Sequence, residues 1–259
     1  MHVLSFKPEV ILYIYMASCI SVLIFNILYI FADRHNGKKF IRRSLSYVDK
    51  ITEQIGLLKE EKEPDAAHFR RMGRDLRKVE NLSAFEDSVL EVKKREPEAY
   101  AARYLQHMRG VFLELTEVYR KRDMIEQAYF AYLVGILGID CGRKSFDGLM
   151  DFLMEMVISK DVSVRENALR AFYSIGNTEA VLAAWRKLDD NERYHSRKLL
   201  ADGLLSFCGD KRELAGLLFG HRKEFATALV LPVMQFIRFF TGEFQSAFLT
   251  LLDGANEDK

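Results

Sequence analysis

Turn-forming residues are scarce in this chain. It has only 4 prolines and 15 glycines among 259 residues. All-β folds depend on such residues at their many turns, so the composition favours helices. An excess of charge of either sign is also lacking, because the formal net charge is +1. Nucleic-acid-binding proteins are usually strongly basic, and this near-neutral balance argues against that class.

Cysteine is also scarce, and the residues that build common catalytic sites are not clustered. Cys19, Cys141 and Cys208 lie far apart in the sequence, which is typical of free thiols in a reducing compartment and not of a secreted disulfide scaffold. The 6 histidines form no HxxxH or HExxH pair, and no Cys-x-x-Cys occurs. Residues 138–145 contain glycines and Lys-Ser but fail the spacing of a phosphate-binding loop. We therefore expect no metal, no cofactor, no small-molecule substrate and no enzymatic activity.

One long hydrophobic run stands out against this background. Residues 10–31, VILYIYMASCISVLIFNILYIF, contain no charged side chain. A helix of about 22 residues is about 33 Å long, which is enough to span a hydrocarbon core of about 30 Å. The run is too long for a signal peptide and ends in a poor cleavage site, Phe31-Ala32-Asp33. A buried core helix is rarely apolar on every face. The sequence therefore predicts a transmembrane helix at residues 10–32.

The flanks of this run predict its orientation. Basic residues follow it closely: Arg34, Lys38, Lys39, Arg42 and Arg43. Positive charge stays on the cytoplasmic side, so we expect residues 1–9 outside the cell membrane and the rest of the chain in the cytoplasm. Tyr13 and Tyr29 lie near the two ends, where aromatic rings suit the interface. Asn26 either hydrogen-bonds another membrane helix or reaches the headgroups.

Residues 33–95 are predicted to form a helical stalk beside the membrane. Val48, Ile51, Ile55 and Leu58 recur at helical spacing, as in a free stalk or in a helix that packs on its neighbours. A second amphipathic segment, residues 65–81, carries a basic ridge formed by Arg70, Arg71, Arg74, Arg77 and Lys78. This ridge either touches lipid headgroups or is an ordinary solvated face. Residues 83–86, SAFE, form a capping-box pattern that predicts a new helix start.

Two helices are expected next, and their tyrosines allow two interpretations. The first helix begins near Pro97, which suits a first turn, and extends to about Arg120. The second begins at Asp123 and ends at Gly138. The tyrosines form either an interaction stripe or inter-helix packing with the hydroxyls at its edge. They are Tyr100, Tyr104, Tyr119, Tyr129 and Tyr132.

A repeat of helix pairs follows, with helix starts about 32 or 33 residues apart. The expected starts are Ser145, Asn177, Asp210 and Gly242. Within the first unit, residues 161–171 read DVSVRENALRA. Asp161 caps a helix whose buried stripe includes Val164 and Ala168, and Arg165 can reach an aspartate in this or the neighbouring turn. Ala168 and Ala171 allow a neighbouring helix to approach closely.

This stretch resembles the HEAT repeat, whose second helix opens with aspartate, then valine-arginine, then a small alanine. Asp161, Val164, Arg165 and Ala168 match that pattern, and the chain looks like a bacterial-type, single-pass, membrane-anchored HEAT-repeat protein. The resemblance implies an all-α fold in which residues 96–259 form an α-solenoid of antiparallel helix pairs. Residues 251–259 look like a turn into a missing second helix, so we expect a fragment of a longer array or a partner covering that end.

HEAT arrays bind proteins along a concave face, so the resemblance implies a membrane-anchored scaffold with a protein partner that is itself expected at the membrane. By analogy the second helices offer contact residues, namely Arg170, Tyr173, Arg193 and Arg197, although each also fits ordinary exposed surface. The alternative function is an accessory or regulatory subunit of an integral-membrane enzyme, such as a polysaccharide-synthesising glycosyltransferase. In that case the anchor would pack beside the membrane helices of the enzyme, with help from Asn26.

Overall fold

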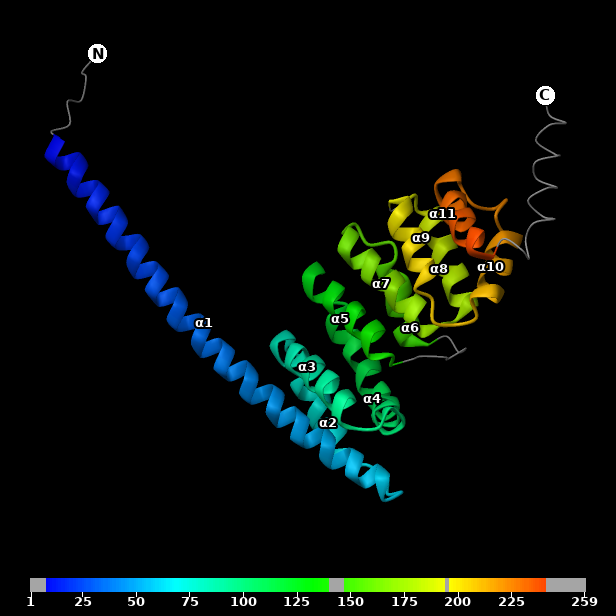
Figure 1. Ribbon diagram of the computed structural model, residues 1–259, viewed down its shortest axis with the longest axis horizontal. Helices are drawn as coiled ribbons and strands as arrows, with labels where there is room; N and C mark the ends of the chain where they lie inside the picture. Colours follow the sequence, from blue (N-terminus) through cyan, green and yellow to red (C-terminus); the bar gives the residue numbers. More distant parts are fainter. Residues whose placement is uncertain (1–7, 140–146, 194–195, 241–259) are drawn as a thin grey trace, which may run out of the picture.

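A computed structural model describes residues 8–139, 147–193 and 196–240, apart from the side chains of residues 8–12, 27–36 and 240. Within these ranges the chain is all-α, as the sequence predicts (Figure 1). In chain order the helices are α1 (Pro8–Lys59), α2 (Ala66–Asp75), α3 (Val79–Arg95), α4 (Glu98–Tyr119), α5 (Met124–Leu137), α6 (Gly148–Met156), α7 (Val162–Ile175), α8 (Thr178–Asp190), α9 (Arg197–Leu205), α10 (Lys211–Gly220), α11 (Thr227–Ile237) and the short 3₁₀ helix η1 (Arg238–Phe240).

Helix α1 is 52 residues long and joins the predicted membrane helix to the first stalk helix without a break. Its first half extends away from all the other helices, while its second half lies along α3 and α4 (Figure 1). The predicted apolar stripe faces this contact and is buried: Val48, Ile51, Ile55 and Leu58. This part of α1 therefore packs on its neighbours and is not a free stalk.

The predicted transmembrane segment, residues 10–32, is helical throughout and belongs to α1. Among the side chains that the structure describes, no helix has an apolar stretch long enough to cross a bilayer. The side chains of residues 10–12 and 27–32 lie outside that set. The helical part of the prediction is confirmed, and the membrane span stays a prediction.

The start of α3 corrects the sequence analysis. The helix begins at Val79, with Lys78 as its N-cap, and Ser83 lies inside it. The capping-box pattern at residues 83–86 is therefore not a helix start. Leu82, Phe85 and residues further along α3 form one buried stripe, and this packing extends the helix through the local signal because tertiary contacts override weak local preferences.

Helices α4 to α11 form successive pairs. Helices of neighbouring pairs that are two positions apart in chain order lie side by side. Helix α7 packs against α5 and α9, and α11 packs against α9. On the other side of the pairs, α4 packs against α6 and α8 against α10. The buried core is continuous from Tyr47 in α1 to Ile237 in α11. It therefore runs across residue 96, the boundary expected between stalk and solenoid.

Most of the predicted helix ends are confirmed. The side chains of Asp123, Asp161, Asn177 and Asp210 accept hydrogen bonds from first-turn backbone N–H groups, which satisfies donors that have no partner within the helix. Gly138 ends α5 in the left-handed conformation, with φ 67°. The expected starts at Ser145 and Gly242, and residues 251–259, lie outside the described residues.

Close approach of α5 and α7 depends on small residues. A Cβ atom added to Gly135 would lie 3.0 Å from the Cα of Ala171, closer than a carbon contact normally allows. Ala168 and Ala171 are completely buried. The predicted role of these alanines in close helix packing is confirmed for Ala171.

Two of the tyrosines, Tyr104 and Tyr119, distinguish an interaction stripe from packing between helices. Tyr104 and Tyr119 are buried in the core. The Tyr119 hydroxyl donates to the Leu76 carbonyl over 2.8 Å, and its ring stacks on Phe130 with centroids 4.6 Å apart. These tyrosines are packing residues with a satisfied hydroxyl, as the second interpretation predicts.

Candidate partner-binding groove

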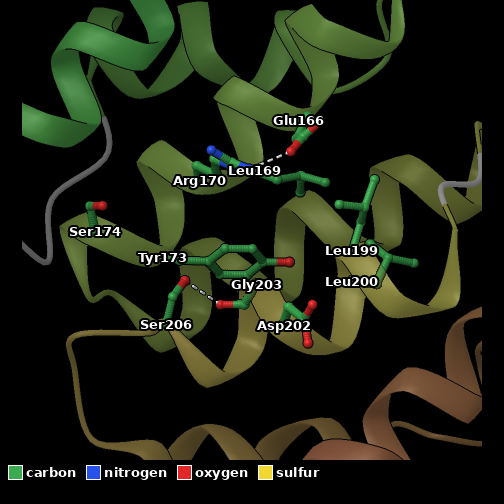
Figure 2. Close-up of a pocket in the computed structure, with 10 residues that line it drawn as sticks. All are labelled: Glu166, Leu169, Arg170, Tyr173, Ser174, Leu199, Leu200, Asp202, Gly203 and Ser206. Atoms are coloured by element: carbon green, nitrogen blue, oxygen red, sulfur yellow. Dashed lines mark hydrogen bonds and ion pairs between the residues drawn. The ribbon is translucent and has the colours of Figure 1, made fainter.

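A groove of about 370 Å³ lies between α7 and α9, the second helices of two successive pairs (Figure 2). We call it the α7–α9 groove. Its lining residues come from α7, from α9 and from the C-cap residue of α9: Glu166, Leu169, Arg170, Tyr173, Ser174, Leu199, Leu200, Asp202, Gly203 and Ser206. Arg170 and Tyr173 of this lining are two of the four contact residues predicted from the sequence.

The floor of the groove is the ring of Tyr173, which lies against Gly203 (Figure 2). Any side chain larger than hydrogen at position 203 would clash with the ring, because a Cβ atom there meets Cε2 of Tyr173. The Tyr173 hydroxyl accepts a hydrogen bond from Nε1 of Trp185 over 3.0 Å. Burial raises the pKa of Tyr173 above its ordinary value, so the hydroxyl stays protonated and neutral.

The rim of the groove is polar. Arg170 forms an ion pair with Glu166, with Nη2 and Oε1 2.6 Å apart, and Asp202 is exposed on the opposite side. Leu199 is 40% exposed beside them. An apolar floor with a charged rim is the composition of a protein-binding pocket, where an apolar side chain enters and polar groups around it fix the orientation.

The ends of α7 and α9 are tied together below the groove. The backbone N–H of Cys208 donates to the Tyr173 carbonyl over 3.0 Å, and its Sγ lies 2.7 Å from the Ser174 carbonyl oxygen. Since Tyr173 carries both this carbonyl and the floor ring, the contact fixes the floor relative to α9. Cys208 therefore links the end of α9 to α7 through hydrogen bonds.

At the other end of α7, Arg165 is buried and binds backbone carbonyls. Its Nη1 donates to the carbonyls of Ser159 and Lys160, over 2.8 and 3.0 Å. Burial and the nearby charge of Arg193 lower the pKa of Arg165. These bonds close the turn that precedes α7, and the nearby charge of Asp161 acts on the pKa of Arg165 in the opposite direction.

The four predicted contact residues occupy different environments. Arg170 is exposed on the groove rim, and Arg193 and Arg197 are exposed outside the groove lining. Tyr173 is only 2% exposed, so it belongs to the core and shapes the floor instead of projecting from the surface. The lining residues that the sequence analysis missed include Leu199, which recurs with Asp202 and Ser206 at helical spacing along α9.

All but one of the predicted membrane-contact residues whose side chains are described are exposed. They are Tyr13, Asn26, Lys38, Lys39 and Arg42, with Arg43 half-buried. The side chains of Tyr29 and Arg34 lie outside the described ones. Apolar side chains along the same part of α1 are also exposed, namely Ile14, Tyr15, Met16, Ile20, Val22, Leu23, Ile24 and Phe25.

The described residues contain no group of three or more His, Cys, Asp or Glu side chains that could hold a metal ion. Within the described part of the chain, Cys19 and Cys208 form no disulfide, and Cys141 lies outside it. Comparison with protein-family models, with curated proteins and with solved structures gives no match for this chain.

Proposed function

We propose that this protein is a non-enzymatic, membrane-anchored adaptor that binds a protein partner in the cytoplasm. The observation that carries the proposal is the apolar first half of α1, which stands away from the helical body (Figure 1). Its side chains are exposed from residue 13 to residue 26, with Tyr13 at 69% and Phe25 at 67%. Exposing apolar surface to water costs about 25 cal/mol of free energy per Å². A bilayer covers a transmembrane helix on every side and so removes this cost.

The direction of insertion follows from the basic residues that come after the apolar run. Lys38, Lys39 and Arg42 are exposed on α1 between the apolar half and the helical body. Positive charge is retained on the cytoplasmic side. The protein is thus a single-pass membrane protein with its N-terminus outside the cell and its helical body in the cytoplasm.

The helical body is proposed to be a HEAT-like α-solenoid. Side-by-side packing of α5, α7, α9 and α11 supports this, since solenoids stack each repeat on its neighbours. The turn closed by Asp161 and Arg165 supports it as well. In this arrangement the α7–α9 groove takes an apolar side chain of the partner, and Arg170 and Asp202 orient it.

The anchor is tested by alkaline extraction of native membranes that contain the full-length protein. Leu23→Arg places a charge in the apolar run, at a cost of about 3 kcal/mol for membrane insertion, and should move protein into the soluble fraction. Ile125→Arg is the matched control, because Ile125 is an exposed apolar residue of α5, at 81% exposure. Complete extraction of the unmodified protein would refute the anchor.

A second candidate function is supported by Asn26, an exposed polar side chain within the apolar run. A buried amide in a membrane helix forms interhelical hydrogen bonds of about 1 kcal/mol. The protein would then be an accessory subunit of an integral-membrane enzyme. Mild crosslinking in the native membrane separates the two functions: a stoichiometric integral-membrane enzyme whose recovery falls with Asn26→Leu favours the accessory subunit, and soluble partners alone favour the adaptor.

A further inference from the structure

A second concave surface lies where α1 meets the start of α3. It is a hollow of about 690 Å³, which we call the α1–α3 hollow. Its lining comes from one stretch of α1 and from the first two turns of α3 with its N-cap: Gly37, Lys39, Phe40, Arg43, Lys78, Val79, Glu80 and Ser83. Two segments that are distant in sequence therefore build one surface.

Cations dominate the α1–α3 hollow. Lys39, Arg43 and Lys78 contribute three positive charges, and Glu80 is the acidic residue of the lining. Among the described residues, no carboxylate lies within salt-bridge distance of these three cations. Arg43 also lines an adjoining hollow of about 400 Å³ together with Arg42 and Lys50. Asp75 is the acidic residue of that lining, so three basic residues and one acidic residue continue the charged surface along α1.

The partial charge of the backbone at the amino end of α3 is also positive. Lys78 is the N-cap of α3 and makes no side-chain capping bond. The amino end of a helix carries a partial positive charge and unpaired N–H groups, which favour an anion. A lysine at this position adds to the positive potential, whereas the aspartate and asparagine caps of other described helices reduce it. The hollow therefore fits a compact anion such as a phosphate group.

The position of the hollow along α1 identifies the source of that phosphate. Lys39 follows Phe31, the end of the apolar run, by about 12 Å along the helix axis. A headgroup layer of roughly 5–8 Å and the length of an extended lysine side chain cover this distance. The half-buried ring of Phe40 supplies an apolar wall beside the cations. A lipid that enters from the membrane surface thus meets both an apolar and a cationic contact.

We propose that the α1–α3 hollow binds the phosphate of an anionic phospholipid headgroup through Lys39, Arg43 and Lys78. This inference rests on the proposed membrane anchor. Bound lipid would hold the helical body at a fixed angle to the membrane, since the hollow joins α1 to α3. The α7–α9 groove would then face partners from one direction.

Amine-selective acetylation tests the proposal on the full-length protein in vesicles. Phosphatidylcholine vesicles are compared with vesicles that also contain phosphatidylglycerol, and lysine modification is measured by mass spectrometry. Phosphatidylglycerol should slow modification of Lys39 and Lys78 at least about threefold, in line with the attraction of basic residues to anionic lipid. Lys38 is exposed on the same helix but outside the lining, so it should be slowed less. Lys223, exposed after α10, should not change.

Variants separate the hollow from general charge attraction. Arg43→Gln leaves both reporter lysines in place and should lower the affinity for phosphatidylglycerol about fivefold, the effect of one basic residue at an anionic surface, so that the slowing of Lys39 and Lys78 is largely lost. Arg103→Gln removes the same charge from an exposed position on α4 and should have no effect. Equal slowing of Lys38, Lys39 and Lys78 would overturn the proposal, because it indicates diffuse attraction. Protection by inorganic phosphate in neutral vesicles would overturn the lipid as the source.

Flotation of the same samples distinguishes failure of the hollow from failure of the anchor. Vesicle-bound protein with no selective protection overturns the lipid site and leaves the anchor intact. Protein that does not float refutes the anchor. The hollow is then judged in detergent with short-chain phosphatidylglycerol against short-chain phosphatidylcholine, where selective protection of Lys39 and Lys78 supports it and equal modification overturns it.

Discussion

His68 and Tyr104 form a buried hydrogen bond between α2 and α4, with Nε2 and the hydroxyl oxygen 2.9 Å apart. His68 is 3% exposed and Tyr104 is 1% exposed. Burial lowers the pKa of His68 to about 4, and the charge of Arg71 adds to this effect. Burial also raises the pKa of Tyr104. The pair is therefore neutral at physiological pH and joins α2 to the core.

The first prediction is that the stability of the protein falls in mildly acidic solution. Above about pH 6.5 His68 is neutral in both the folded and the unfolded state and adds no pH dependence. Between about pH 6.5 and 4 the unfolded state binds a proton that the folded state does not, so the free energy of unfolding falls, by about 3 kcal/mol in total. Urea denaturation in detergent across this range measures the slope.

His68→Gln is the matched variant for this prediction. The glutamine can still hydrogen-bond the Tyr104 hydroxyl but does not titrate. The difference in unfolding free energy between the two proteins should therefore change between pH 6.5 and 4. A difference that stays constant over this range would contradict the lowered pKa of His68.

The second prediction concerns the floor of the α7–α9 groove. Tyr173→Phe leaves the indole N–H of Trp185 buried without the acceptor that it has now, at an expected cost of about 1–3 kcal/mol in unfolding free energy. Tyr132→Phe is the control, because the Tyr132 hydroxyl donates to Glu86 in a half-buried position where water can replace it. Equal losses for the two variants would argue against the Trp185 bond as the cause.

The third prediction concerns the close packing of α5 on α7. Gly135→Ala should lower the unfolding free energy by about 1–2 kcal/mol, because the new methyl group meets the backbone of Ala171 and overpacking outweighs the better helix propensity. Gly216→Ala on α10 has open space around the new Cβ atom and should stabilise the protein by about 0.5–1 kcal/mol. Thermal unfolding of both variants, followed by circular dichroism, checks the opposite signs.

The fourth prediction follows from the proposed partner. Leu199→Asp places a charge on the apolar side of the groove and should lower partner recovery in membrane crosslinking at least tenfold, typical of a lost anchor contact of about 1.4 kcal/mol or more. Met124→Asp changes an equally apolar residue that is 50% exposed on α5 and should leave recovery unchanged. If both variants behave alike, the partner binds elsewhere.

The helix ends were predictable from the sequence because capping is local. Asp161 and Asp210 satisfy backbone donors within their own first turn, and Gly138 takes a left-handed conformation that few other residues tolerate. The apolar stripe at Val48 and Ile51 was also visible as a period. The helices that this stripe contacts could not be predicted, since a free stalk and a packed helix need the same pattern.

The errors occur where a local signal competes with packing. Ser83 has the chemistry of a helix cap, but the buried contacts of Leu82 and Phe85 continue the helix through it. Tyr173 fits a surface position on α7 by analogy, yet the small Gly203 on α9 admits its ring to the core. Neither outcome can be read from one helix alone, because the partner helix decides it.

By itself, the sequence determined the all-α class, the length of the apolar run, and most helix boundaries, since these depend on composition, period and neighbours within one turn. Only the tertiary structure decided that α1 is one continuous helix packed on α3 and α4. It also decided that Lys39 and Lys78 line one hollow, and that a groove opens between α7 and α9. These features join residues that are far apart in the chain, and the physical reason is that burial of apolar side chains, not sequence proximity, sets which helices meet.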